Sequence, residues 1–156
     1  MKFIAHRGLT EGPDVNLENR PEQIEKSMKD GFECEIDLWV TNSDLYLGHD
    51  RPDYAVTLEW LQKYHAYYGL WIHAKNLGAL RWLTTTEFNY FWHQEDDFAL
   101  TSNKYIWTYP GKELTTRSIL VMPEALDKNL EIEYNNIYAV CSDYVTKLRE
   151  KYYDSK

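Results

Sequence analysis

The feature that most constrains the fold is residues 32–40, FECEIDLWV, an apolar and β-prone segment that also carries three carboxylates. Side chains alternate along a strand, so Glu33, Glu35 and Asp37 share one face and the apolar side chains take the other. If the acidic face met water, this would be an ordinary half-buried strand. If it lies inside the protein, three like charges need compensation, because burying an unpaired carboxylate is costly.

Strand-like and helix-like segments alternate along the chain, separated by turn residues. We predict strands at residues 2–6, 32–40, 70–75, 89–93, 98–101, 105–108, 118–122 and 137–141, with a short additional strand at 45–47. We predict helices at residues 21–29, 57–65, 77–84 and 144–153. This alternation is typical of a mostly parallel α/β sheet, and a strand count near eight predicts a compact (β/α)8 TIM-type barrel with several outer helices shortened or missing. The length of 156 residues predicts a single domain over residues 1–156.

A parallel sheet is usually covered on both faces, so we expect the acidic face of residues 32–40 to turn inward and its apolar face to meet helices. Other candidate side chains lie at or near the carboxyl ends of predicted strands: His6, Arg7, His49, His73 and Lys75. The carboxyl ends of parallel strands meet at one edge, where active sites form. We therefore expect these side chains to gather around Glu35 and Asp37.

This set of residues indicates chemistry on a phosphate. Inward carboxylates hold a hard cation through oxygen, and the cation and an arginine together neutralise phosphoryl oxygens. Two imidazoles can then move protons near neutral pH. The sequence therefore predicts a site for a divalent cation and a phosphate at this edge of the sheet.

The charge of the chain argues against several classes of partner. A net charge of −8 is unsuited to a general nucleic-acid binder or to an anionic membrane surface. No stretch reaches membrane-spanning length, and the N-terminal MKFIAHRG lacks the apolar core of a signal peptide, so we expect a cytoplasmic protein with no stable membrane insertion. Cys34 and Cys141 form no CxxC pair, and we expect both to be buried, reduced thiols.

Four short motifs carry a family resemblance. They are His6-Arg7-Gly8, Glu18-Asn19, the segment GFECEID at 31–37, and His49-Asp50. Their order and spacing resemble the glycerophosphodiester phosphodiesterases and their phospholipase C-like relatives. Residues 139–144, AVCSDY, are similar to the last strand of that family. The likeness therefore covers the two ends of the chain, while the middle of the chain is only weakly similar to the family.

The resemblance implies a barrel that cleaves phosphodiesters with a divalent cation, usually magnesium or calcium. It assigns roles by position: the general acid and base are His6 and His49, the metal ligands are Glu35 and Asp37, and the groups that hold phosphate or balance its charge are Arg7 and Lys75. The expected partner is a small-molecule phosphodiester.

Two departures from the family pattern affect the expected metal and substrate. His73 stands where the family has a third carboxylate ligand, and a neutral nitrogen in that place disfavours Ca²⁺ most. We expect Mg²⁺, with Mn²⁺ and Zn²⁺ also suited, while the alternative that His73 binds no metal stays open. The short connection between His49 and Leu70 resembles a compact branch of the family. This leaves open whether the alcohol is derived from a lipid or from a glycan.

Two other functions compete with a hydrolase. The same cavity would serve a non-catalytic protein that binds a phosphorylated glycan or lipid headgroup, or the charges would form an internal ion-pair network. The polar residues 92–97 predict a structural turn more than a ligand contact. The aromatic side chains of Tyr105, Trp107 and Tyr109 share one strand face, where they either pack in the core or stack on a sugar or lipid headgroup.

Overall fold

The computed structural model describes residues 1–130 and 136–154. It contains one ten-stranded mixed sheet. Its strands are β1 (Lys2–Ala5), β2 (Glu33–Thr41), β3 (Asp44–Leu47), β4 (Tyr54–Val56), β5 (Leu70–Ala74), β6 (Tyr90–Phe91), β7 (Phe98–Leu100), β8 (Ile106–Thr108), β9 (Ser118–Val121) and β10 (Ala139–Ser142). The α-helices of the described residues are α1 (Pro21–Lys29), α2 (Leu58–Tyr68), α3 (Leu77–Leu83) and α4 (Val145–Asp154), and two single 3-10 turns are η1 (His6–Gly8) and η2 (Pro123–Ala125).

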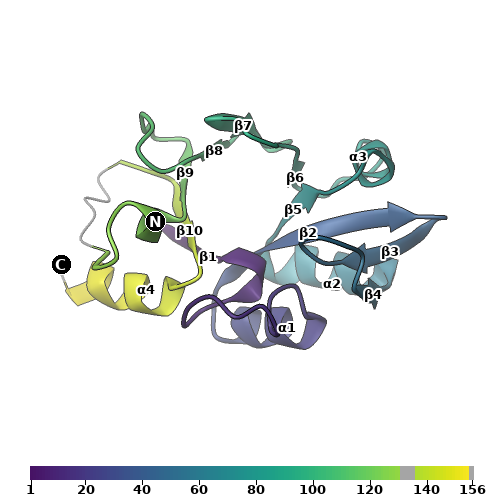
Figure 1. Cartoon of the computed structure of the whole chain (residues 1–156), viewed down its shortest axis with the longest axis horizontal. Helices are drawn as coiled ribbons and strands as arrows, with labels where there is room; N and C mark the ends of the chain where they lie inside the picture. The colour runs from purple at the N-terminus through teal and green to yellow at the C-terminus, as the bar shows by residue number, and fades with distance from the viewer. Residues whose placement is uncertain (131–135, 155–156) are drawn as a thin grey trace.

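Seven strands of the sheet run parallel, in the spatial order β8, β9, β10, β1, β2, β5 and β6. The sheet curls around a concave interior, as Figure 1 shows. The carboxyl-terminal half of β2 extends beyond the curled part of the sheet. It forms an antiparallel hairpin with β3, to which β4 adds a third strand. The parallel order brings the carboxyl ends of β1, β2 and β5 next to one another.

The prediction of a (β/α)8 barrel is wrong. The strands form a curled half-barrel, since β7 is antiparallel to β8 and no ladder of the described residues joins β6 to β7. Only residues 101–105 connect β7 to β8, whereas a parallel crossover needs a dozen or more residues, so this connection can form only a hairpin. In place of a ladder, the N–H of Ser102 donates to the carbonyl of Tyr90 at 2.8 Å.

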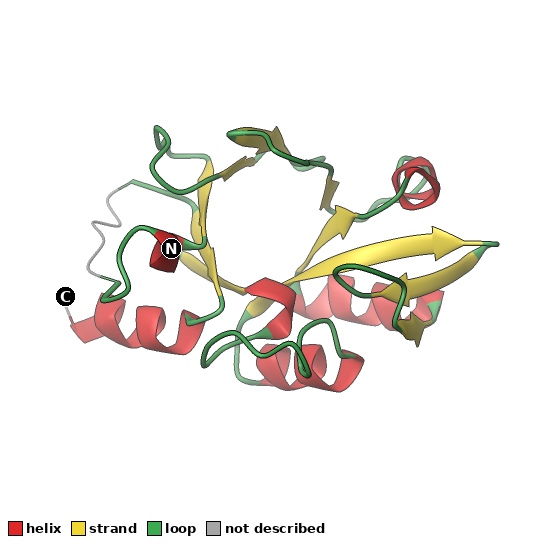
Figure 2. Cartoon of the chain, in the orientation of Figure 1, coloured by secondary structure: helices red, strands yellow, loops and turns green. Residues whose placement is uncertain are grey.

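The helices cover one part of the sheet only. In Figure 2, α1, α2 and α4 lie along the outer side of the strands, and α3 lies beside β5. The stretch from the end of β6 to the start of β9, residues 92–117, contains no α-helix. No helix of the described residues is both long enough and apolar enough to cross a membrane.

The structure shows what each face of β2 contacts. The apolar side chains of β2, Cys34, Ile36 and Leu38, are fully buried in the core layer between the sheet and the helices. The acidic side chains Glu35 and Asp37 are 2% and 1% exposed and line a cavity inside the curled sheet. A second apolar cluster includes Trp71 and Trp107, and Trp107 also lines the cavity. The half-exposed alternative for this strand is therefore excluded.

Truncation on the apolar face of β2 should destabilise the fold strongly. Ile36 is 0% exposed within the helix-facing core, so Ile36→Ala leaves a cavity and should lower the free energy of unfolding by about 2 to 5 kcal/mol. Val15→Ala is the matched control, because Val15 is 79% exposed and its truncation should change stability by no more than about 0.5 kcal/mol. Urea denaturation measures both. Equal effects of the two substitutions would contradict this layer assignment.

Candidate active site

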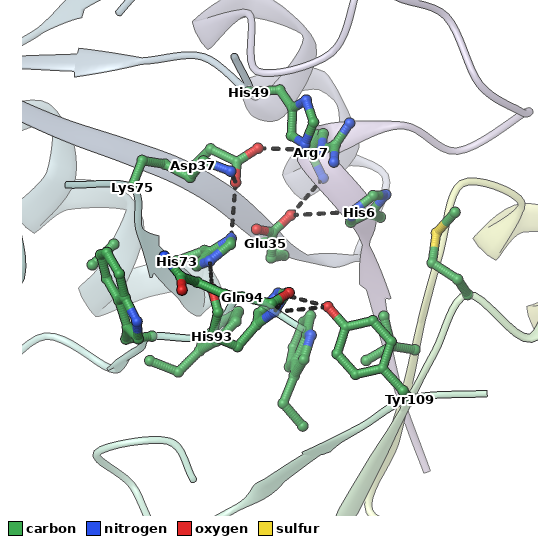
Figure 3. A pocket seen from close by; sticks show the side chains of 16 residues that line it. His6, Arg7, Glu35, Asp37, His49, His73, Lys75, His93, Gln94 and Tyr109 are labelled. Atoms are coloured by element: carbon green, nitrogen blue, oxygen red, sulfur yellow. Dashed lines mark hydrogen bonds and ion pairs between the residues drawn. The ribbon is translucent and has the colours of Figure 1, made fainter. Parts of the chain in front are cut away.

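A cavity of about 440 Å³ opens at the carboxyl ends of the parallel strands. All seven side chains that the sequence singled out line it, and we call them the ionic wall: His6, Arg7, Glu35, Asp37, His49, His73 and Lys75. They come from η1, which directly follows β1, from β2 and β5, and from the segments that follow β3 and β5. Figure 3 shows them around the two carboxylates of β2. Side chains that are up to 69 residues apart in the sequence, from His6 to Lys75, therefore share one cavity.

Three of these side chains converge closely enough to bind one ion. Asp37 and His73 are cross-strand neighbours in the β2–β5 ladder, and Glu35 lies one step earlier on the same face of β2. One ligand atom of each lies within 4.8 Å of the other two, and all three residues are buried. Two carboxylate oxygens and one imidazole nitrogen are a donor set that suits Mg²⁺, Mn²⁺ or Zn²⁺. The side chains present therefore fit a divalent cation.

The Asp37 carboxylate is held by several partners. Asn19 donates from Nδ2 to Oδ2 at 2.8 Å and accepts the Asp37 backbone N–H at 2.9 Å. Lys75 Nζ and Arg7 Nε lie 3.5 Å and 3.2 Å from its oxygens. Burial alone would raise the pKa of Asp37, but the hydrogen bond with His73 and the charge of Arg7 outweigh it, and the pKa falls. Asp37 is therefore ionised at neutral pH.

The negative charge of Glu35 has fewer compensating partners than that of Asp37. It accepts the backbone N–H of Arg7 at 3.0 Å, and His6 Nε2 lies 3.9 Å from the same oxygen. Burial and the neighbouring charge of Asp37 raise the pKa of Glu35. A second positive charge beside this carboxylate would relieve both effects. The electrostatics of the pair thus favour a cation between Glu35 and Asp37.

Arg7 reaches both carboxylates because of an unusual backbone. Its φ of 52° and ψ of 26° place it in the left-handed region, which is uncommon for a residue other than glycine. In this conformation the backbone N–H points to Glu35 and the guanidinium reaches Asp37 and Glu18, the latter at 2.8 Å. Such strained residues cluster at functional sites. The next residue, Gly8, also has a positive φ, and a Cβ there would meet Ile24 at 2.9 Å, so the turn requires glycine.

His6 is oriented by a carboxylate behind it. Its Nδ1 lies 2.8 Å from Oδ1 of Asp143, which follows β10, and the backbone N–H of Asp143 donates to Glu124 at 3.0 Å. Burial lowers the pKa of His6, but the Asp143 hydrogen bond and the charge of Glu35 outweigh burial and raise it. With Nδ1 facing Asp143, Nε2 is the nitrogen directed to the cavity. His6 is thus arranged as a proton carrier with one active nitrogen.

His73 lies between two hydrogen-bond acceptors. Its Nδ1 is 3.0 Å from Asp37 Oδ1, and its Nε2 is 3.4 Å from the backbone carbonyl of His93. A neutral imidazole has one N–H, so it can donate to only one of these oxygens. Without an ion, the shorter contact fits donation from Nδ1 to Asp37, which is the hydrogen bond that lowers the pKa of Asp37. A cation held at Nδ1 would take the place of this proton, and the N–H would then lie on Nε2 and donate to the carbonyl of His93.

His49 lies at the rim of the cavity. Its side chain is 35% exposed, and its Nδ1 is 2.9 Å from Asp50. Partial burial and the charge of Arg7 lower the pKa of His49. It is therefore neutral at pH 7 and able to accept a proton.

The other side of the cavity is uncharged, and we call it the aromatic wall: Phe91, Trp92, His93, Gln94, Trp107 and Tyr109. The Tyr109 hydroxyl lies 2.6 Å from His93 Nε2, and the His93 ring stacks on His73 with 4.4 Å between centroids. Burial lowers the pKa of His93 to about 4 and raises the pKa of Tyr109 to about 12, so both are neutral at pH 7. Tyr105 does not line the cavity but stacks on Tyr138.

Four residues of the site were not among the predicted ones: Asn19, His93, Tyr109 and Asp143. Two of them had a signal in the sequence, since Asn19 belongs to the Glu18-Asn19 motif and Asp143 to the last strand of the family resemblance. His93 lies in residues 92–97, for which a structural turn was the favoured prediction, and Tyr109 lies on a strand face for which core packing and stacking on a sugar or lipid headgroup both stayed open.

Comparison of the chain with protein-family models, with curated proteins and with solved structures gives no match. The resemblance to glycerophosphodiester phosphodiesterases therefore stays a prediction that rests on the motifs of the chain.

Proposed function

We propose that the protein is a metal-dependent phosphodiester hydrolase. The observation that carries this proposal is the meeting, in one cavity, of a buried three-residue cation site, two cationic side chains and two imidazoles. Binding alone does not require two proton carriers, whereas cleavage of a P–O bond uses one to activate the nucleophile and one to protonate the leaving alcohol. The alternative of a purely structural ion-pair network does not account for the cavity beside these charges.

Glu35, Asp37 and His73 are the residues that would hold the cation. When bound, the ion supplies charge that stabilises the phosphoryl oxygens. Mg²⁺ is the expected ion, with Mn²⁺ and Zn²⁺ suited to the imidazole and Ca²⁺ disfavoured by it.

The remaining side chains of the ionic wall either bind the phosphate or transfer protons. Arg7 and Lys75 line the cavity beside Asp37 and neutralise the non-bridging oxygens of the phosphate. His6, fixed by Asp143, presents Nε2 to the reacting group, and His49 faces the cavity from the rim. One imidazole removes a proton from the nucleophile, and the other gives a proton to the leaving alcohol. The P–O bond to that alcohol breaks as the new P–O bond forms.

The test of this function is hydrolysis of a panel of phosphodiesters followed by phosphorus NMR, with Mg²⁺, Mn²⁺, Zn²⁺ or Ca²⁺ in parallel samples. We expect turnover with Mg²⁺ or Mn²⁺, loss of turnover in a chelator, and the least activity with Ca²⁺. Binding of phosphodiesters without turnover under any metal would favour the non-catalytic alternative. A tight preference for Ca²⁺ would contradict the role given to His73.

A further inference from the structure

The two walls of the cavity differ in chemistry. All four formally charged side chains that line it, Arg7, Glu35, Asp37 and Lys75, belong to the ionic wall. The aromatic wall comes from the segments around β6 and β8, adjoins the ionic wall at His73, and offers ring faces, an imidazole, a phenol and an amide. Figure 3 shows His93, Gln94 and Tyr109 on this side. A phosphate at the ionic wall therefore directs one of its alcohol groups toward aromatic and neutral polar side chains.

The aromatic wall combines flat apolar faces with groups that both donate and accept hydrogen bonds. Trp92 lines the cavity and is 38% exposed, so part of its ring is accessible to a ligand. Deeper in the cavity, the Tyr109 hydroxyl and the His93 imidazole form a neutral donor and acceptor pair at 2.6 Å. Gln94 is exposed beside them and adds an amide. An acyl chain at this wall would leave the Gln94 amide and the remaining lone pair of the Tyr109 oxygen without hydrogen bonds, which is costly.

From this wall, and resting on the phosphate chemistry proposed above, we infer that the substrate carries a pyranose sugar as one of its two alcohols. A pyranose has an apolar C–H face that suits stacking on an indole ring, and hydroxyls around its edge that pair with imidazole, phenol and amide groups. The cavity of about 440 Å³ is within the range of pockets that hold an intact small ligand. Trp92 stacks on the ring, and His93 and Tyr109 bind its hydroxyls.

Three monoanionic phosphodiesters separate this inference from its competitors: methyl glucose-1-phosphate, methyl glycerol-3-phosphate and diethyl phosphate. Isothermal titration calorimetry of the whole chain with Mg²⁺ measures binding, and phosphorus NMR of the same samples measures cleavage. We expect the glucose diester to bind about tenfold more tightly than diethyl phosphate, with the glycerol diester close to diethyl phosphate. Equal binding of the glucose and glycerol diesters would overturn the inference of a sugar ring.

Two variants assign the preference to the aromatic wall. Trp92→Ala and Tyr109→Phe should each remove most of the preference for the glucose diester and leave the affinity for diethyl phosphate unchanged. Tyr105→Phe is the matched control, because Tyr105 lies outside the cavity, and it should keep the preference. A preference that survives both wall variants would overturn the inference.

The same measurements distinguish the two proposals. Preferential binding of the glucose diester without cleavage would contradict the hydrolase and leave the sugar inference standing. Cleavage of all three diesters with equal affinity would contradict the sugar inference alone. Absence of binding by all three would contradict both, because the sugar inference depends on the phosphate site.

Discussion

Replacing His6 with glutamine should lower the turnover of a phosphodiester by about 10²- to 10⁴-fold, the usual contribution of one positioned proton carrier. The His6 side chain is only 14% exposed and its Nδ1 is held at 2.8 Å by Asp143, so Nε2 has a fixed direction into the cavity. Glutamine keeps polarity and approximate size but cannot carry a proton near neutral pH. The loss should fall on kcat, while the rise in melting temperature caused by a divalent cation should persist, since His6 is outside the proposed ligand set.

The matched control for this change is His65→Gln. His65 lies on α2, packs edge-on against Phe88 and does not line the cavity. Its replacement should leave turnover close to that of the wild type. If His6→Gln also retained wild-type turnover with a folded chain, His6 would have no catalytic role and the acid–base part of the account would fail.

Replacing Glu35 with glutamine should remove the stabilisation that a divalent cation gives. A ligand present at about 100 times its Kd stabilises a folded chain by about 2.7 kcal/mol, which for a domain of this size corresponds to a melting temperature higher by roughly 5 to 10 °C. Glutamine keeps the shape of Glu35 but supplies no charge to a hard cation. Differential scanning fluorimetry with and without Mg²⁺ or Mn²⁺ measures the loss.

Without metal, Glu35→Gln should be at least as stable as the wild type. Burial and Asp37 raise the pKa of Glu35, so its ionised form is disfavoured in the folded chain and costs stability that increases as the pH rises through the range between its unfolded and folded pKa values. A neutral amide removes this cost. A strong loss of stability in the metal-free variant would contradict the description of Glu35 as a carboxylate whose charge is only partly compensated.

Glu33→Gln is the matched control on the same face of the same strand. Glu33 pairs with Lys2 and accepts a hydrogen bond from Trp71 Nε1 at 2.7 Å, and it does not line the cavity. The metal response of this variant should equal that of the wild type. A metal response lost equally in both variants would show that the effect is general to the acidic strand and would contradict the three-residue site.

Much of the secondary structure could be predicted from the sequence, because hydrophobic periodicity and capping residues are local signals. Helix α1 begins at Pro21 and ends at Lys29 as predicted, and the side chain of Thr57 caps α2 through the N–H of Trp60. The three-residue strand β4 was missed, since its burial pattern is mixed. The direction of β7 is not predicted by a count of strands, because the count does not show how each strand runs; the short connection over residues 101–105 makes β7 and β8 a hairpin.

The ionic wall could be predicted because each of its residues lies within a predicted strand or one or two residues after it. Strand alternation alone put Glu35 and Asp37 on the face opposite Ile36, and parallel pairing put His73 beside Asp37. The aromatic wall could not be predicted in the same way. The contact of Tyr109 with His93 depends on how the sheet curls after β6, where the helices are absent and no periodic pattern fixes the geometry.

The central claim is that Glu35, Asp37 and His73 together bind a divalent cation beside a phosphate. A crystal grown with Mn²⁺ and inorganic phosphate tests it most directly through the anomalous scattering of the metal. The account predicts one strong anomalous peak bonded to the two carboxylates and to Nδ1 of His73, with phosphate density next to Arg7. A cavity that holds no metal at saturating Mn²⁺, or a metal bound only at other residues, would contradict it.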